Sequence, residues 1–346
     1  MSQKPAIFFP VDAADNPVGG TNILIRIAQW LKDAGHDVTI LHNEPRFAYV
    51  FWSHDVALGY DPKLKNMMRG RKAEWARPKL KRRLLPFVYG GAPNPVCEPK
   101  AGDIVVLPEY RYPELAALYP ECRRLVAIQD VFGFYRGFLR DPGGAALSQA
   151  EAVFATSKAC LDAAKAVYDG TVREITLPID LPGLDFTAEK SRQIAYMPRK
   201  RATEAAAVAQ ALALAPETAD YEIIPIDGRP PQEVARILRE ARIFLSYSKE
   251  EGFGLPPAEA MRAGCITIGF TGVGGEEFFT PETGIVVPDS DIVGIINATR
   301  AVAAEYDRDP ARLDALRRHA ATFVSERYTV AAFEASAQAF WDPIAR

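Results

Sequence analysis

Short apolar segments alternate with amphipathic segments along most of the 346-residue chain, and this alternation limits the possible folds more than any other feature. The first cycle has the pattern of a strand at AIFFPV, a helix at TNILIRIAQWLKDAG and a strand at DVTILH. Strand, helix and strand in this order form a βαβ unit with parallel strands. We therefore predict an α/β protein whose ligands bind at the carboxyl ends of parallel strands.

The alternation occurs in two series, separated by a segment rich in proline and glycine at residues 178–186. The first series continues with strands at DIVVLPE, RLVAIQD and AVFATS, and the second has strands at QIAYMP, YEIIPI, RIFLSYS and CITIGF. Because the chain is longer than one core comfortably supports, we predict two Rossmann-like domains that face each other across a cleft, at 1–180 and 187–330. Residues 331–346 should form a helix that packs as core and could cross back to the first domain.

Composition narrows the classes of function. A net charge of -3 gives no reason to expect nucleic acid as a partner, and no apolar run approaches the length of a membrane span. The four cysteines are scattered, which predicts reduced thiols in the cytoplasm and argues against a zinc or disulfide framework. The four histidines also lie apart from clusters of acids, so we predict no metal site.

One segment, YSKEEGFGLPPAEAMRAG at residues 247–264, combines two glutamates separated by seven residues with a glycine-rich turn and two prolines. It follows an apolar strand and leads into a helix, so it should form a strand–loop–helix connection. Gly252 and Gly254 allow the backbone to approach a ligand, and the first turn of the helix offers free N–H groups to an anion. Glu251 and Glu259 can then face one small volume above the strand. Each could instead be a solvated acid or a partner of the helix dipole.

The longer run SYSKEEGFGLPPAEAMRAGCITIGFTGVGGEEFF, followed by TGIVVP, resembles the donor-binding half of family 4 of the retaining glycosyltransferases. The resemblance is strong from about Tyr221 to Asp289 and collinear from Gln193, and in the N-terminal half it rests on PVGG and the order of the strands. It implies the GT-B fold of two facing Rossmann-like domains. It also implies a metal-independent hexosyltransferase that takes a nucleotide-diphosphate sugar, retains the anomeric configuration and needs no cofactor.

The resemblance implies roles for the residues of the glycine-rich segment. Glu259 would accept hydrogen bonds from the ribose hydroxyls, and Glu251 would accept them from the transferred sugar. The loop around Gly252 would bind sugar and phosphate oxygens through the backbone amides of the next three residues, Phe253, Gly254 and Leu255. The departing phosphate itself would take the proton of the acceptor in a front-face displacement.

The leaving diphosphate also needs a cation, and the segment MPRKR supplies three after the first strand of the second domain. The family has an arginine followed several residues later by a lysine, whereas here the cations are adjacent and Glu204 stands near the lysine position. We predict that Arg199 and Lys200 act in catalysis and that Arg201 binds the donor. Which of the three contacts the phosphate stays open, and all three could simply cap the next helix.

The other candidates of the donor site lie in loops that would face the cleft. Gln129 ends a strand where the family often has a histidine, and glutamine can bind a hydroxyl group but cannot relay a proton. Asp130 follows it directly. The remaining candidates are glycines that would bring the backbone close to the ligand, namely Gly19, Gly20, Gly274 and Gly275.

Two further segments allow several interpretations. Residues 63–83 carry ten lysines or arginines against one acid, which suits a membrane surface, an anionic polysaccharide or a solvated loop. The aromatic residues of 131–138, expected in a loop, could stack on an acceptor sugar or pack in the core.

The leading interpretation is a cytoplasmic transferase, either free or peripheral at the membrane, that acts in cell-envelope or exopolysaccharide synthesis on a glycan or lipid-linked acceptor. The first alternative is a nucleotide-sugar 2-epimerase or hydrolase, which would need more acid–base side chains than this chain offers. The second is a non-catalytic nucleotide-sugar-binding subunit, suggested by the missing histidine and the altered cation pattern.

Overall fold

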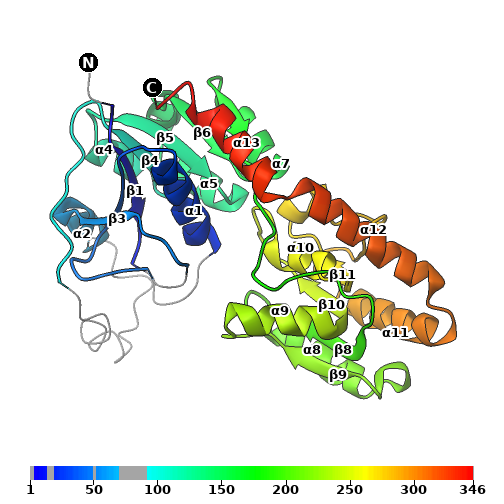
Figure 1. Cartoon of the computed structure of the whole chain (residues 1–346). Coiled ribbons are helices and arrows are strands. Elements are labelled where there is room, and N and C mark those ends of the chain that lie inside the picture. Colours follow the sequence, from blue (N-terminus) through cyan, green and yellow to red (C-terminus); the bar gives the residue numbers. More distant parts are fainter. Residues whose placement is uncertain (1–3, 14–18, 50–51, 70–91, 346) are drawn as a thin grey trace.

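The computed structural model describes residues 4–13, 19–49, 52–69 and 92–345, which form two α/β domains side by side (Figure 1). All the strand pairs in both sheets are parallel, and helices cover the sheets. The predicted fold class, two Rossmann-like domains with parallel sheets, is confirmed.

The N-terminal sheet has the strand order β3-β2-β1-β4-β5-β6-β7. Its strands are β1 (Ile7–Val11), β2 (Val38–His42), β3 (Ala57–Tyr60), β4 (Ile104–Pro108), β5 (Arg123–Ile128), β6 (Ala152–Ala155) and β7 (Val172–Glu174). Its α-helices are α1 (Gly19–Asp33), α2 (Pro62–Arg69), α4 (Tyr112–Leu118), α5 (Val131–Phe138), α6 (Ala145–Ser148) and α7 (Lys158–Lys165).

Both faces of this sheet are buried, as the apolar strands predict. Alternate residues of β1 enter different cores: Ile7 and Phe9 pack with α1, whereas Phe8 packs on the opposite face. That opposite core contains residues of α4, α5 and α7. With both faces covered, the carboxyl edge of the sheet is the part left for a ligand.

The C-terminal sheet has the strand order β12-β11-β10-β8-β9. Its strands are β8 (Ser191–Tyr196), β9 (Glu222–Pro225), β10 (Ala241–Tyr247), β11 (Ile266–Phe270) and β12 (Ile285–Val286). The helices of this half of the chain are α8 (Ala202–Ala213), α9 (Pro231–Glu240), α10 (Leu255–Arg262), α11 (Ile292–Arg308), α12 (Ala311–Arg327) and α13 (Val330–Trp341).

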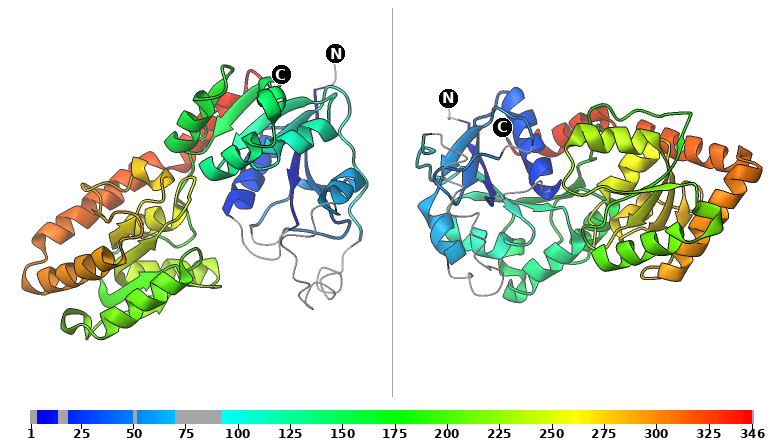
Figure 2. Two further views of the ribbon diagram at one scale, coloured as in Figure 1. Left: turned by 180° about the vertical axis from the view of Figure 1, so that it is seen from behind. Right: turned by 90° about the horizontal axis from the view of Figure 1, so that it is seen from below.

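Helix α13 packs on the N-terminal sheet although it ends the C-terminal half of the sequence (Figures 1 and 2). Phe333, Phe340 and Trp341 share a core with β1 and α1, and the rings of Trp341 and Phe9 lie 6.3 Å apart. Its apolar positions thus complete the core of the first domain.

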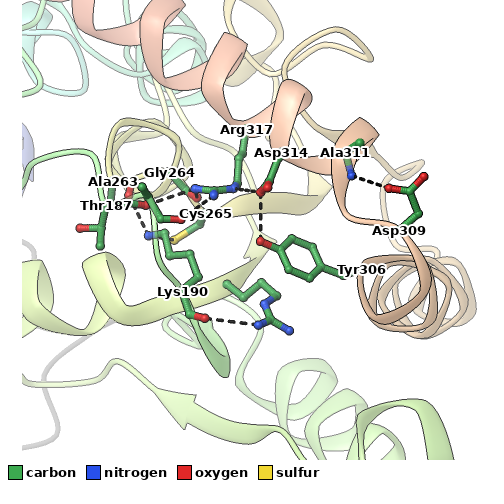
Figure 3. Close-up of polar contacts among 12 residues, drawn as sticks. Thr187, Lys190, Ala263, Gly264, Cys265, Tyr306, Asp309, Ala311, Asp314 and Arg317 are labelled. Atoms are coloured by element: carbon green, nitrogen blue, oxygen red, sulfur yellow. Dashed lines mark hydrogen bonds and ion pairs between the residues drawn. The ribbon is translucent and has the colours of Figure 1, made fainter.

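The segment that leads into β8 is held by two basic side chains (Figure 3). Arg317 of α12 is fully buried and donates hydrogen bonds to the carbonyl oxygens of Thr187 and Ala188. Lys190 donates to the carbonyl oxygens of Leu238 and Ala263 at 3.0 and 2.7 Å. These bonds anchor the segment that links the two domains to α9, α10 and α12 of the C-terminal domain.

Two local predictions differ from the structure. Residues 131–138 form helix α5 and no loop, because Asp130 caps it by accepting a hydrogen bond from the Phe132 amide and Phe134 is buried on its inner face. The stretch between β2 and β4, for which the sequence analysis predicts no regular element, contains β3 and α2.

The basic segment at 63–83 lies largely outside the described residues. Its described part belongs to α2, where Lys63 and Lys65 form ion pairs with Glu98 and Glu44 at 2.9 and 3.4 Å. Within the described ranges, no helix has the length and apolar character needed to cross a membrane.

Candidate functional site

A cavity of about 540 Å³ lies between the two domains at the carboxyl ends of their strands. The N-terminal domain contributes residues that follow β1, β4 and β5, together with the first turns of α1. The C-terminal domain contributes residues that follow β8, β9 and β10, together with the first turns of α10. This is the position at which parallel sheets bind ligands.

Glu251 and Lys200 form an ion pair at this cavity. Lys200 Nζ lies 3.0 Å from Glu251 Oε1 and also donates to the carbonyl oxygens of Lys249 and Glu250, at 2.8 and 2.9 Å. Arg199 reaches the same carboxylate only at 4.0 Å, and its side chain is 65% exposed. Of the two predicted cations that line the cavity, Lys200 is therefore the one that the protein holds in place, whereas the side chain of Arg199 is largely exposed.

Glu259 lines the same cavity from α10, and its carboxylate has no hydrogen-bond partner among the described residues. Desolvation by the surrounding protein, helped by the negative charge of Asp180, raises the pKa of Glu259 to about 7. The carboxylate of Glu259 would therefore be stabilised by any ligand that donates hydrogen bonds to it.

The loop between the two glutamates exposes backbone donors. Gly254 has a φ of 97°, which lets the chain turn into α10, and the amides of Phe253, Gly254 and Leu255 make no hydrogen bond within the described chain. The ring of Phe253 points away into the core, 5.0 Å from the rings of Phe278 and Tyr328. The side chain thus anchors the loop, and the amides are left to bind a ligand.

Gly274 and Gly275 do not line the cavity, contrary to the sequence-based expectation. They lie behind the glycine-rich loop, where the Gly274 amide donates to the carbonyl oxygen of Glu251 at 3.0 Å. A Cβ atom on Gly274 would lie 2.1 Å from the Gly252 oxygen, so only glycine allows this approach. Their role in this structure is to support the loop.

Arg201 also lies outside the cavity, which corrects its predicted place in the donor site. Its residue is only 5% exposed, its guanidinium donates to Asp289 and Ser290, and it stacks over the ring of Phe270. An arginine bound in this way connects the end of the C-terminal sheet to the loop at Asp289 and Ser290, away from the cavity.

The N-terminal candidates Gly19, Gly20, Gln129 and Asp130 all line the cavity. The first two begin α1, and a Cβ atom on Gly20 would lie 3.5 Å from the side-chain oxygen of Gln129. Asp130 also caps α5.

The glycine-rich loop is also one of the places at which the two domains touch. A Cβ atom on Gly252 would lie 1.6 Å from the carbonyl oxygen of Gln129, and the hydroxyl of Ser157 donates to the carbonyl oxygen of Gly252. Beside this contact, Arg136 pairs with Glu250 at 2.6 Å. The position of Glu251 therefore depends on the N-terminal domain as well as on the C-terminal domain, to which Glu251 belongs.

Replacing Gly252 by alanine should push the two domains apart at this contact, because the new methyl group cannot occupy the space of the Gln129 backbone. We expect a lower melting temperature and a loss of ligand affinity at the cavity, measured by thermal unfolding and calorimetry. Gly275→Ala is the matched control, since the nearest atom to its new Cβ lies at an ordinary 3.7 Å. Equal effects of the two substitutions would contradict the assignment.

Glu109 was not among the predicted site residues, although it lines the cavity directly after β4. Desolvation is the main reason that its pKa rises to about 8, and the nearby Asp130 adds to it. The sequence contained a usable signal, since DIVVLPE places an acid at the carboxyl end of a predicted parallel strand. Ser246 and Ser248, at the end of β10, are further cavity residues that the motif analysis missed.

Residues 201–305 match the family model described as "Glycosyl transferases group 1". An alpha-1,6-glucosyltransferase of Actinobacillus pleuropneumoniae serotype 7 (strain AP76) is 37% identical over 107 residues, a match that spans 28% of this chain and 32% of that relative. Both sequence matches therefore cover only part of the chain.

Solved structures are similar over nearly the whole chain. Sucrose-phosphate synthase of Thermosynechococcus elongatus has a TM-score of 0.68 at 16% identity, with 99% of both chains covered. Anabaena HepE in complex with UDP-glucose has a TM-score of 0.65 at 12% identity, with 98% of this chain and 100% of that chain covered. The chain has the GT-B fold. At these identities the similarity concerns the fold alone.

Proposed function

We propose that this protein is a retaining glycosyltransferase that moves a hexosyl unit from a nucleotide-diphosphate sugar to a glycan or lipid-linked acceptor. One observation carries the proposal: a single cavity at the carboxyl ends of both sheets contains the Glu251–Lys200 pair, the unpartnered Glu259 and the free amides between them. The match of residues 201–305 to the group 1 glycosyltransferases covers Glu251, Glu259 and the loop between them.

The proposed roles follow from the chemistry of each group. The carboxylate of Glu259 accepts hydrogen bonds from two neighbouring ribose hydroxyls, and Glu251 accepts from hydroxyls of the transferred sugar. Lys200, with Arg199 beside it, faces the diphosphate, which gains negative charge as the glycosidic bond breaks. The departing phosphate oxygen takes the proton of the attacking acceptor hydroxyl, so no separate base is required.

Hydrolysis of the nucleotide sugar is the second candidate, because Glu109 and Glu259 both have pKa values raised toward neutrality at the cavity. Water would then replace the acceptor. The two reactions differ in their products, since only transfer makes a new glycoside.

The test begins with a panel of nucleoside diphosphates and their sugar conjugates, screened by thermal shift. The best ligand is then incubated with the protein and a mixture of glycan acceptors, and nucleotide release and new glycosides are measured. We expect both products. A melting shift without nucleotide release would indicate a binding subunit, release without a glycoside would indicate a hydrolase, and no shift with any nucleotide would refute the proposal.

Chelation should leave turnover unchanged, because Lys200 and Arg199 supply the positive charge that a divalent ion supplies in metal-dependent transferases. Nucleotide release is measured with and without excess EDTA, and then with added magnesium or manganese. A loss of activity that one of these ions restores would show that the assignment of charge to the two side chains is wrong.

Affinity for the donor should depend on pH through Glu259. Its pKa in the free protein is about 7, and the ribose hydroxyls bind the charged form, so affinity falls as pH falls below 7, by at most about tenfold per pH unit. UDP-glucose is the suitable probe because its esterified diphosphate does not titrate near neutrality. Calorimetry from pH 5.5 to 8 should give a sloping profile for the native protein and a flatter one for Glu259→Gln; parallel profiles would rule Glu259 out as the source.

A further inference from the structure

The two walls of the cavity differ in where their cations lie, although both carry acids. Among the described residues that line it, every lysine and arginine belongs to the C-terminal domain, on the side of Lys200. The N-terminal wall carries three acids, Asp12, Glu109 and Asp130, and no described basic residue. Asp12 is paired with Arg111 at 3.0 Å, and among the described residues this wall presents no cation to the cavity that could bind an anionic group.

Glu109 carries a buried oxygen without a partner on this wall. The residue is 5% exposed, and Oε2 makes no hydrogen bond with the described residues. Its pKa of about 8 means that the carboxyl group is mostly neutral at pH 7. A neutral carboxyl group has a hydrogen to donate, which a carboxylate lacks.

Gln129 presents a second buried oxygen to the same cavity, and its Oε1 also has no partner in the described chain. Gly20 of α1 lies beside it without a side chain, and a Cβ atom at that position would lie 3.5 Å from the oxygen. The wall thus offers a donor at Glu109 and an acceptor at Gln129. A hydroxyl group accepts and donates at once, so it can satisfy both.

We propose that Glu109 and Gln129 bind the hydroxyl groups of an uncharged sugar, with neutral Glu109 donating and Gln129 accepting. The proposal rests on the proposed transferase function. The sugar is either the hexose of the donor or a hexose of the acceptor, and the two sources share this chemistry. In either case the described residues of the N-terminal wall include no cation that would favour an anionic sugar over an uncharged one.

Three other titratable groups face Glu109. Asp130 approaches from the start of α5 and Cys160 from α7, and Tyr110 is its neighbour in the chain. Burial raises the pKa of Cys160 to about 12 and also raises that of Tyr110, so both stay neutral between pH 6 and 9. A fall in sugar binding as pH rises through 8 is therefore attributable to Glu109, because deprotonation of Glu259 would act in the opposite direction.

The test compares Glu109→Ala and Glu109→Gln with the native protein and with Glu121→Ala, a control at an exposed glutamate of the same domain. Calorimetry measures affinity for UDP and for UDP-glucose, and saturation-transfer NMR measures binding of methyl α-D-glucoside and glucuronate to the UDP-loaded protein. The melting temperature and UDP affinity should be unchanged in every variant, which shows that the fold and the nucleotide site are intact.

We expect Glu109→Ala to weaken one of the two hexose ligands by roughly tenfold, since a hydrogen bond is lost. A lower affinity for UDP-glucose would assign Glu109 and Gln129 to the hexose of the donor. A lower affinity for methyl α-D-glucoside would assign them to a hexose of the acceptor. Glu109→Gln should retain binding, because an amide also donates, and should lack the fall in affinity that the native protein shows above pH 8.

The proposal is overturned if Glu109→Ala binds both hexose ligands as the native protein does, if glucuronate binds as well as the glucoside, or if the native protein binds neither hexose. These outcomes are separable from a failure of the proposed function, in which UDP itself would not bind. If UDP does not bind, the NMR measurement with methyl α-D-glucoside is repeated without UDP. It still tests whether Glu109 and Gln129 bind a sugar.

Discussion

Replacing Lys200 by alanine is expected to lower turnover by about a hundred- to a thousandfold, the range found when one preorganised charge or donor is removed from a transition state. Lys200 is held by Glu251 and by two carbonyl oxygens, so its position costs no reorganisation when the diphosphate gains charge. Arg199→Ala should have a smaller effect, because Arg199 is more exposed and lies farther from Glu251.

Turnover and UDP affinity are measured for both variants and for Lys165→Ala, a control at an exposed lysine of α7. A loss of turnover with little change in UDP affinity supports a transition-state role. If Arg199→Ala proved the more damaging change, the phosphate contact would belong to Arg199. A collapse of the melting temperature in Lys200→Ala would mean that Lys200 mainly holds the loop.

Alanine substitutions of Glu259 and Glu251 should have different kinetic signatures. Each removes hydrogen bonds to a carboxylate, worth roughly 1.5 to 3 kcal/mol, or about ten- to a hundredfold. Glu259→Ala should weaken UDP and UDP-glucose about equally and appear mainly in KM, because the ribose contact is the same in the ground and transition states. Glu251→Ala should leave UDP affinity nearly intact and lower kcat, because the sugar spends less time in the reactive geometry.

Calorimetry with UDP and turnover measurements separate the two cases. Glu250→Ala is the neighbouring control, although it also removes the ion pair with Arg136. Equal losses of UDP affinity in Glu251→Ala and Glu259→Ala would contradict the division of roles. Native turnover in Glu251→Ala would remove this residue from the catalytic machinery.

The elements around the cavity were largely predictable because their signals are local. The residue pattern shows directly the apolar runs that form β8, β10 and β11 and the glycine-rich connection into α10. The two glutamates were predicted from the segment at 247–264. Helix α5 was missed because its residues are mostly aromatic and glycine, and its cap by Asp130 and the burial of Phe134 outweigh weak helix propensity.

The roles of adjacent residues could not be assigned from the sequence. Arg199, Lys200 and Arg201 are consecutive, yet they point to solvent, to Glu251 and to Asp289 respectively. Sequence spacing gives no information on which partner each long side chain reaches, because the partners come from other loops.

The residue pattern by itself determined two parallel α/β domains and the acid pair in the loop and helix that follow β10, since periodicity and glycine positions act within a few residues. Only the tertiary structure decided which groups share the cavity. Glu109 and Gln129 come from the N-terminal domain. The backbone of Gly252 contacts that of Gln129, although more than a hundred residues separate them in the sequence. Burial also depends on that assembly, and it is burial that raises the pKa values of Glu109 and Glu259.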